Sequence, residues 1–190
     1  KYLKEPKFGK EPSGQRLDLI LKSPNFRNGK FENIHKTPQI TEGYSYFEVL
    51  SEFFFKKNIR RVPVDVLPSV RTNLLTLPVE EDILVWFGHS SYFIQIEGKR
   101  ILVDPVFSGN ASPIAGTTKS FKGTDIYKVD ELPVIDYLLI THDHYDHLDY
   151  KTIMELKPKI KQIICALGVG SHFEFWGFAK HIIIEKDWHE

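Results

Sequence analysis

The feature that most constrains this 190-residue chain is an apolar strand that runs straight into a cluster of metal-ligating side chains. The run VIDYLLI, residues 134–140, is followed at once by THDHYDH, residues 141–147, which holds three histidines and two aspartates. Residues i and i+2 of an extended segment point to the same side, so His142 and His144 can reach one ion. The segment therefore predicts a metal site at the end of a buried strand.

Asp146 and His147 complete the motif His-x-His-x-Asp-His as the chain turns toward a helix. They can reach a second ion a few ångströms from the first. Imidazole and carboxylate ligands suit zinc, and also iron or manganese. Two ions about 3.5–4 Å apart can clamp an ester during a displacement. The alternative, a solvated polar turn rich in histidine by chance, fits poorly with a strand before the motif and a helix after it.

The pattern around the motif predicts an α/β domain. From residue 83 the runs ILVWF, YFIQIE and RILVDP predict three strands in a meander, with a tight turn at Glu97–Lys99. After the motif we expect a helix with Asp149 as its N-cap, a buried strand IKQIICAL, a helix ending near Gly177 and a last strand HIIIE. Strands that alternate with helices favour a sheet layered by helices. Residues 107–131 form a long loop, which is usually functional or covered by a partner.

The segment before residue 62 lacks the pattern of alternating strands and helices. Residues 1–43 show little periodicity and predict an irregular arm. Residues 44–57 place aromatic and aliphatic side chains at helical spacing, which predicts an amphipathic helix. Its aromatic face would by default lie in the core, and the alternatives are a membrane contact or a wall of a substrate site. Prolines at positions 63, 68 and 78 then predict an extended linker.

Charge is distributed unevenly along the chain, although 25 Lys and Arg balance 25 Asp and Glu. Residues 1–61 carry a net charge of +6, from 13 basic and 7 acidic residues, and residues 62–190 carry −6. The basic segment either faces an anionic surface such as lipid headgroups, or packs on its own acidic body, or is simply solvated. No basic patch favours nucleic acid as a partner.

Composition limits the remaining classes. The single cysteine, Cys165, allows no intrachain disulfide and lies in an apolar run typical of a core. No apolar run reaches the ~18 residues that a membrane span needs. The chain begins at Lys1 and its one methionine is Met154, so we expect the native N-terminus to lie further upstream. The sequence leaves an intracellular or a membrane-associated location open.

The metal motif identifies a family resemblance. His-x-His-x-Asp-His at the end of a strand is the signature of the metallo-β-lactamase superfamily. The stretches LVWFGHSSYFIQIEGKRILVDPVFSGNASP and LPVIDYLLITHDHYDHLDYKTI resemble the branch that contains N-acyl-phosphatidylethanolamine-hydrolysing phospholipase D and its bacterial relatives. The resemblance implies the first half of an αββα sandwich in residues 62–190, a mixed β-sheet flanked by helices. Residues 1–61 would form the arm and the aromatic helix.

The resemblance also implies a site with two metal ions, most simply zinc. His142 and His144 would hold one ion, and Asp146 and His147 the other, with Asp146 also able to steer a proton. In the family the remaining ligands come from sequence that follows the equivalent of EKDWHE, where this chain stops. We therefore expect a hydrolase of phosphodiester or lipid-like substrates in the full-length protein. The alternatives are a lactonase of the same superfamily, or an inactive fragment that binds metal weakly or not at all. We expect such a fragment to associate as a homodimer, as a domain swap or with a complementing chain.

Three further residues are candidates near this site. The resemblance places Asp104, at the end of a strand, behind the histidine loop, where it would orient a ligand. The alternative for Asp104 is a turn cap before proline. His89, in the turn GHSS, would line the mouth of the site, or else be a hydrogen-bonded structural histidine. Tyr145 would flank the pocket. The isolated histidines are expected to be structural or exposed: His35, His172, His181 and His189.

Overall fold

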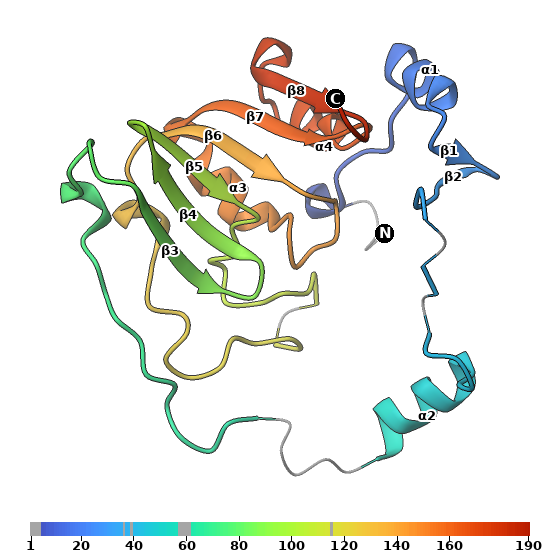
Figure 1. Cartoon of the computed structure of the whole chain (residues 1–190), viewed down its shortest axis with the longest axis horizontal. Coiled ribbons are helices and arrows are strands. Elements are labelled where there is room, and N and C mark those ends of the chain that lie inside the picture. The colour runs from blue at the N-terminus through green and yellow to red at the C-terminus, as the bar shows by residue number, and fades with distance from the viewer. Residues whose placement is uncertain (1–4, 36, 39, 57–61, 115) are drawn as a thin grey trace.

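A six-stranded mixed sheet forms the body of the molecule in the computed structural model, which describes residues 5–35, 37–38, 40–56, 62–114 and 116–190 (Figure 1). The strands follow one another across the sheet in their sequence order. They are β3 (Ile83–Gly88), β4 (Ser91–Ile96), β5 (Lys99–Val103), β6 (Ile135–Ile140), β7 (Ile160–Ala166) and β8 (Ile183–Lys186).

The first three strands form the predicted antiparallel meander. The β4–β5 hairpin closes through Glu97 and Gly98, whose φ angles of 48° and 72° are both positive. Two successive positive φ values match the right-handed twist of paired strands, which is why such turns favour glycine at the second position. The predicted turn at Glu97–Lys99 is confirmed, with Ile96 paired to Lys99.

The last strands, β5 to β8, are parallel, so helices or long loops must carry the chain back between them. The helices α3 (Tyr150–Leu156) and α4 (Gly170–Phe175) connect β6 to β7 and β7 to β8. Both lie on the same face of the sheet (Figure 1), as right-handed crossovers between successive neighbours require. The Asp149 side chain accepts a hydrogen bond from the Lys151 amide, which confirms the predicted N-cap.

The core lies between this face of the sheet and the two helices. Alternate residues of each strand point toward it, and each large apolar side chain that becomes fully buried contributes about 1.5–3 kcal/mol. The most deeply buried apolar side chains of the sheet and these two helices are Phe93, Leu102, Ile135, Leu138, Ile140, Ile153, Leu156, Ile163 and Phe173. A sheet with helices against it is the fold class that the sequence predicted.

The opposite face of the sheet is also apolar, but most of its side chains are half-buried or exposed. Leu84 and Trp86 on the edge strand β3 are 66% and 67% exposed. Half-buried side chains on the inner strands continue the same surface: Tyr92, Ile94, Ile101, Tyr137, Leu139 and Ile164. The association of this chain with a second copy or a complementing chain stays a prediction.

The N-terminal arm is more regular than the sequence analysis predicted. It contains the helix α1 (Gln15–Lys22) and a small hairpin of β1 (Phe26–Arg27) and β2 (Lys30–Phe31). The expectation of an irregular arm was therefore wrong for these segments. Asn28 and Gly29 form the turn with φ angles of 54° and 78°, and an Asn-Gly pair between hydrophobic residues is the local signal that could have found it.

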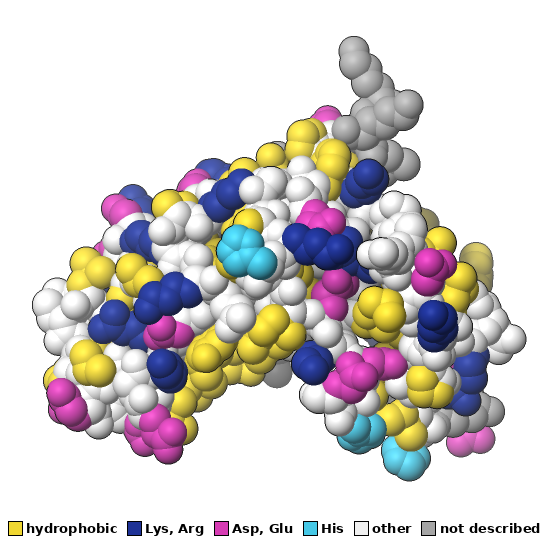
Figure 2. Space-filling view, turned by 90° about the horizontal axis from the view of Figure 1, so that it is seen from above, with side chains coloured by type: hydrophobic (Ala, Val, Ile, Leu, Met, Phe, Trp, Pro, Cys, Tyr) yellow, Lys and Arg dark blue, Asp and Glu magenta, His cyan; other side chains and the backbone are white. Residues whose placement is uncertain are grey.

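The arm is fixed to the body by hydrogen bonds and ion pairs. The guanidinium group of Arg16 contacts Glu185 at 2.6 Å and Glu174 at 3.0 Å, on β8 and α4. Closer to the N-terminus of the arm, the Pro6 carbonyl accepts a hydrogen bond from the indole of Trp176 at 2.7 Å. The basic arm thus pairs in part with its own acidic body, as one of the alternatives proposed. On the face shown in Figure 2, basic, acidic and hydrophobic side chains are interspersed.

The helix α2 (Tyr46–Phe55) confirms the predicted aromatic helix, but its predicted place in the core was wrong. Ser45 and Glu48 form a capping box that starts the helix. No α2 residue is buried, and Phe47 and Phe55 are 80% and 84% exposed. Figure 1 shows α2 apart from the sheet. Helical spacing predicts a face but not what covers it, so contact with lipid stays a prediction.

Extended segments and 3₁₀ turns complete the described chain. The predicted linker after residue 62 is extended up to a buried turn at Leu74, while residues 57–61, at the end of the predicted arm, lie outside the described residues. No helix within the described ranges is long and apolar enough to cross a membrane. The 3₁₀ turns are η2 (Pro6–Phe8), η3 (Leu74–Thr76), η4 (Val129–Glu131), η5 (Lys157–Lys159) and η6 (Lys180–Ile182).

Candidate metal centre

The histidine segment THDHYDH forms the connection between the carboxyl end of β6 and the N-cap of α3. Within it, the backbone amides of His147 and Leu148 donate to the His144 carbonyl at 2.9 and 2.8 Å. This turn brings the second part of the motif back over the end of β6. The side chains of the motif are therefore gathered at one edge of the sheet.

Three imidazole rings lie side by side at this edge. The ring centroid of His142 lies 4.6 Å from that of His144 and 3.9 Å from that of His147. Burial, and then the neighbouring His147 and His144, lower the pKa of His142. A lowered pKa favours the neutral imidazole, which is the form that binds a metal ion.

Asp104 orients one of these rings. Its carboxylate accepts a hydrogen bond from Nδ1 of His147 at 2.8 Å and two from Thr141, from the amide at 2.8 Å and from the hydroxyl at 2.6 Å. The Asp104 side chain is 1% exposed. Because an ionised carboxylate only accepts, the proton of His147 lies on Nδ1 and the Nε2 lone pair is free to bind an ion.

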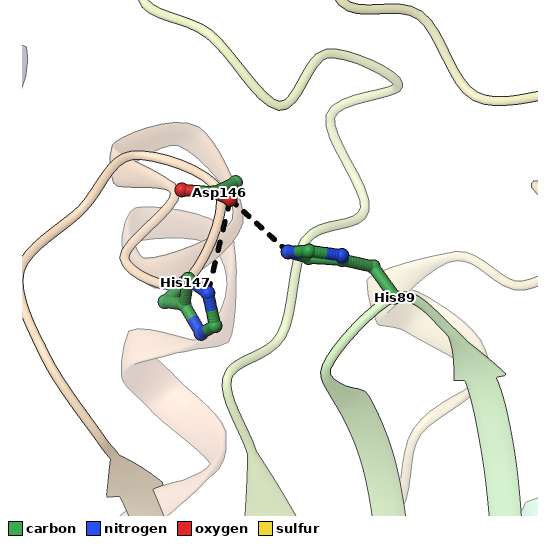
Figure 3. Close-up of side chains that lie close together, drawn as sticks. All are labelled: His89, Asp146 and His147. Carbon is green, nitrogen blue, oxygen red and sulfur yellow. Dashed lines mark hydrogen bonds and ion pairs between the residues drawn. The ribbon is translucent and has the colours of Figure 1, made fainter. Parts of the chain in front are cut away.

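Asp146 lies between His147 and His89 (Figure 3). Its Oδ2 is 3.0 Å from Nε2 of His89 and 3.7 Å from Nε2 of His147. One ligand atom from each of the three residues lies within 4.8 Å of the other two, a spacing that suits one metal ion. Burial opposes the ionisation of Asp146, but its own backbone amide, His147 and His89 outweigh this effect and hold its pKa below the ordinary value.

His89 reaches this position from a strained turn. It joins β3 to β4 with a φ angle of 46°, a region that residues other than glycine rarely adopt. The indole of Trp86 donates to the His89 carbonyl at 3.0 Å and fixes the turn. The sequence predicts His89 at the mouth of the site or in a structural role. The contact of His89 with Asp146, which is 57 residues away, was not predicted.

Comparison with known proteins identifies this part of the molecule. Residues 99–190 match the family model described as the beta-lactamase superfamily domain. This part of the chain belongs to the beta-lactamase superfamily. The match includes β5 to β8 and the whole histidine segment, so the resemblance predicted from the motif is confirmed.

Two curated relatives align with more of the chain than the family model does. An uncharacterised protein of Mycobacterium tuberculosis is 30% identical over 169 residues, which cover 88% of this chain and 45% of that protein. N-acyl-phosphatidylethanolamine-hydrolyzing phospholipase D 1 of Caenorhabditis elegans is 31% identical over 188 residues, covering 86% and 50%. A UPF0173 metal-dependent hydrolase of Caldivirga maquilingensis is 38% identical over 65 residues, covering 34% and 23%. The chain spans about half the length of the first two relatives.

Other predicted residues of the superfamily domain lie around the histidines. Tyr145 lines a small cavity of about 260 Å³ next to His144, on the side of the arm. Asp143 points away from the cluster, toward Nε2 of His172 at 3.5 Å. His172 in turn accepts a hydrogen bond from the Lys10 amide at 3.0 Å, which fits the structural role expected for it.

Proposed function

We propose that this chain supplies the histidine-rich part of the active site of a metal-dependent hydrolase that cleaves phosphodiesters. The observation that carries this proposal is the contact of Asp104 with His147. A buried carboxylate holds the imidazole so that Nε2 faces Asp146, 3.7 Å away. Carboxylate–histidine pairs of this kind stand behind metal ligands and fix their tautomer and direction.

The donor set fits metal ions. The imidazoles of His142, His144 and His147, with the carboxylate of Asp146, match the nitrogen and oxygen ligands that zinc prefers, and they also suit iron or manganese. We propose that His142 and His144 hold one ion, and that Asp146 and His147 hold a second. When bound, such ions supply an activated water and stabilise negative charge that develops on the ester.

Residues of this chain would orient the metal ligands and accept a proton beside the ions. Asp104 keeps the proton of His147 on Nδ1, and the Thr141 hydroxyl, which donates to Asp104, completes that hydrogen-bonded unit. The carboxylate of Asp146, with its lowered pKa, is ionised at neutral pH and can accept a proton. His89 donates to Asp146 from the opposite side and limits its movement.

The substrate class is inferred from similarity to known proteins and from the donor chemistry. The Caenorhabditis elegans relative is by its name a phospholipase D, an enzyme that cleaves a phosphodiester. Paired ions suit this chemistry because they can stabilise both the attacking and the leaving oxygen of a displacement at phosphorus. The Caldivirga maquilingensis relative is named a metal-dependent hydrolase. Both names support hydrolysis with metal ions, and the phosphodiester is our specific choice.

Hydrolysis of bis-p-nitrophenyl phosphate by the full-length protein, with added zinc, manganese or iron, tests this function. We expect turnover that Asp146→Ala lowers by at least about 100-fold, since a metal ligand and proton acceptor are both lost. Asp143→Ala is the matched control in the same loop, because Asp143 faces His172 instead of the cluster. Equal turnover by the wild-type protein and Asp146→Ala would contradict the proposal.

A further inference from the structure

A cavity of about 530 Å³ opens beside the candidate metal centre, on the side of His89 and Asp146. It lies between the β3–β4 turn and the long loop that follows β5. Its wall is rich in aromatic side chains, contributed by Trp86, Phe87, Phe107, Phe121 and Tyr127. His89 and Asp146 also line the cavity, and both belong to the group whose ligand atoms can hold an ion.

Hydrogen bonds hold the wall in place. The Ala111 amide donates to the Thr118 carbonyl at 2.9 Å and closes the loop on itself. The extended segment before β3 supports the loop from outside, since the Thr72 amide donates to the Tyr127 hydroxyl at 2.8 Å. The cavity therefore exists before any ligand binds, as small-molecule sites commonly do.

The aromatic side chains divide into a fixed inner set and an exposed rim. Phe87 packs edge to face on Phe107 at 5.1 Å and on Tyr127 at 4.9 Å, between ring centroids. At the rim, Trp86 is 67% exposed and Phe121 is 42% exposed. A ligand that covers the rim removes this apolar surface from water, which favours an apolar ligand, and aromatic edges and faces pack well on another ring.

We propose that this cavity binds one substituent of the phosphodiester, and that the favoured substituent is a compact aromatic group. This inference rests on the proposed function, because the reacting phosphate would lie beside Asp146. Apart from Asp146, the charged side chains that line the cavity are Lys119 and Asp125, which are both exposed and can remain in water. The volume lies within the range of about 300–1,000 Å³ that small-molecule sites occupy.

Calorimetric titration of the zinc-loaded chain with two diesters of equal charge tests the proposal without requiring turnover. Diphenyl phosphate should bind at least about tenfold more tightly than dimethyl phosphate, since only its rings can occupy the cavity. Ala111→Phe fills the cavity and should remove this preference. Ala179→Phe makes the same exchange at an exposed site outside the cavity lining and should keep the preference.

A second variant guards against misfolding of Ala111→Phe. Phe121→Ala removes a partly exposed rim side chain and should reduce the preference for diphenyl phosphate severalfold. Equal binding of the two diesters, no measurable binding of diphenyl phosphate, or an unchanged preference in both variants would overturn the proposal. A preference that Ala111→Phe removes in a protein without hydrolytic activity would support the cavity and contradict only the proposed function. Hydrolytic activity together with an unchanged preference in both variants would support the proposed function and contradict the cavity proposal.

Discussion

The carboxylate of Asp104 lies 2.8 Å from Nδ1 of His147, although 43 residues separate them in the sequence. The parallel pairing of β5 and β6 causes this contact, because it brings the carboxyl ends of two strands to the same edge of the sheet. Asp104 directly follows β5, and the histidine segment begins directly after β6. The sheet topology thus places the Asp104 carboxylate behind the candidate metal centre.

Replacement of Asp104 tests that support. Asp104→Asn keeps the shape of the side chain but removes the charge that fixes the proton of His147 on Nδ1. We expect zinc affinity to fall about 10–100-fold, the usual cost of losing such a partner. Competition with a chelator measures it. Asp136→Asn is the control, since Asp136 binds the Arg100 amide and Lys161 away from the histidines. Unchanged zinc affinity in Asp104→Asn would contradict the orienting role.

Local rules explain why so much of the fold could be predicted from the sequence. The turn at Glu97–Gly98, the N-cap at Asp149 and the strand that precedes His142 each depend on residues within one short segment. The contact of His89 with Asp146 and the exposure of Phe47 on α2 depend on how distant segments pack. No periodicity within one segment carries that information, so these features required the structure.

The ion pairs of Arg16 make the docking of the arm depend on pH. Hydrogen bonding to Arg16 lowers the pKa of Glu174 from its ordinary value of 4.5. The ionised Glu174 carboxylate stabilises the docked arm fully at pH values above 4.5, its ordinary pKa. This stabilisation is lost as the pH falls through the lowered pKa of the folded state. We expect proteolysis of the arm to accelerate below pH 4.5 in the wild-type protein.

Arg16→Met should weaken the docking at neutral pH by about 1–3 kcal/mol, the usual net value of hydrogen bonds to charged groups. The acid dependence of arm cleavage should also become flatter in this variant. Arg27→Met is the control, because Arg27 is half exposed and pairs with Glu32 within the arm itself. If Arg16→Met and Arg27→Met were cleaved at the same rate at every pH, the ion pairs would not hold the arm.

Gly123 lets the linker before β3 approach the long loop. A Cβ atom at this position would lie 2.2 Å from the carbonyl oxygen of Leu67, and the φ angle is 93°. Gly123→Ala should therefore lower the free energy of unfolding by about 1–3 kcal/mol, measured by urea denaturation. Gly43→Ala separates the two causes, since Gly43 has a φ angle of 90° but open space around it. Equal losses in both variants would show that the close approach to Leu67 costs nothing.

The central claim is that the histidine segment binds metal ions, and zinc binding by His144→Ala tests it most directly. Zinc content and affinity are measured on the wild-type chain, on His144→Ala and on the control His181→Ala, whose side chain is exposed on η6. We predict that His144→Ala keeps its fold by circular dichroism and binds zinc at least about 100-fold more weakly, while His181→Ala matches the wild-type chain. Equal zinc binding by all three proteins would contradict the claim.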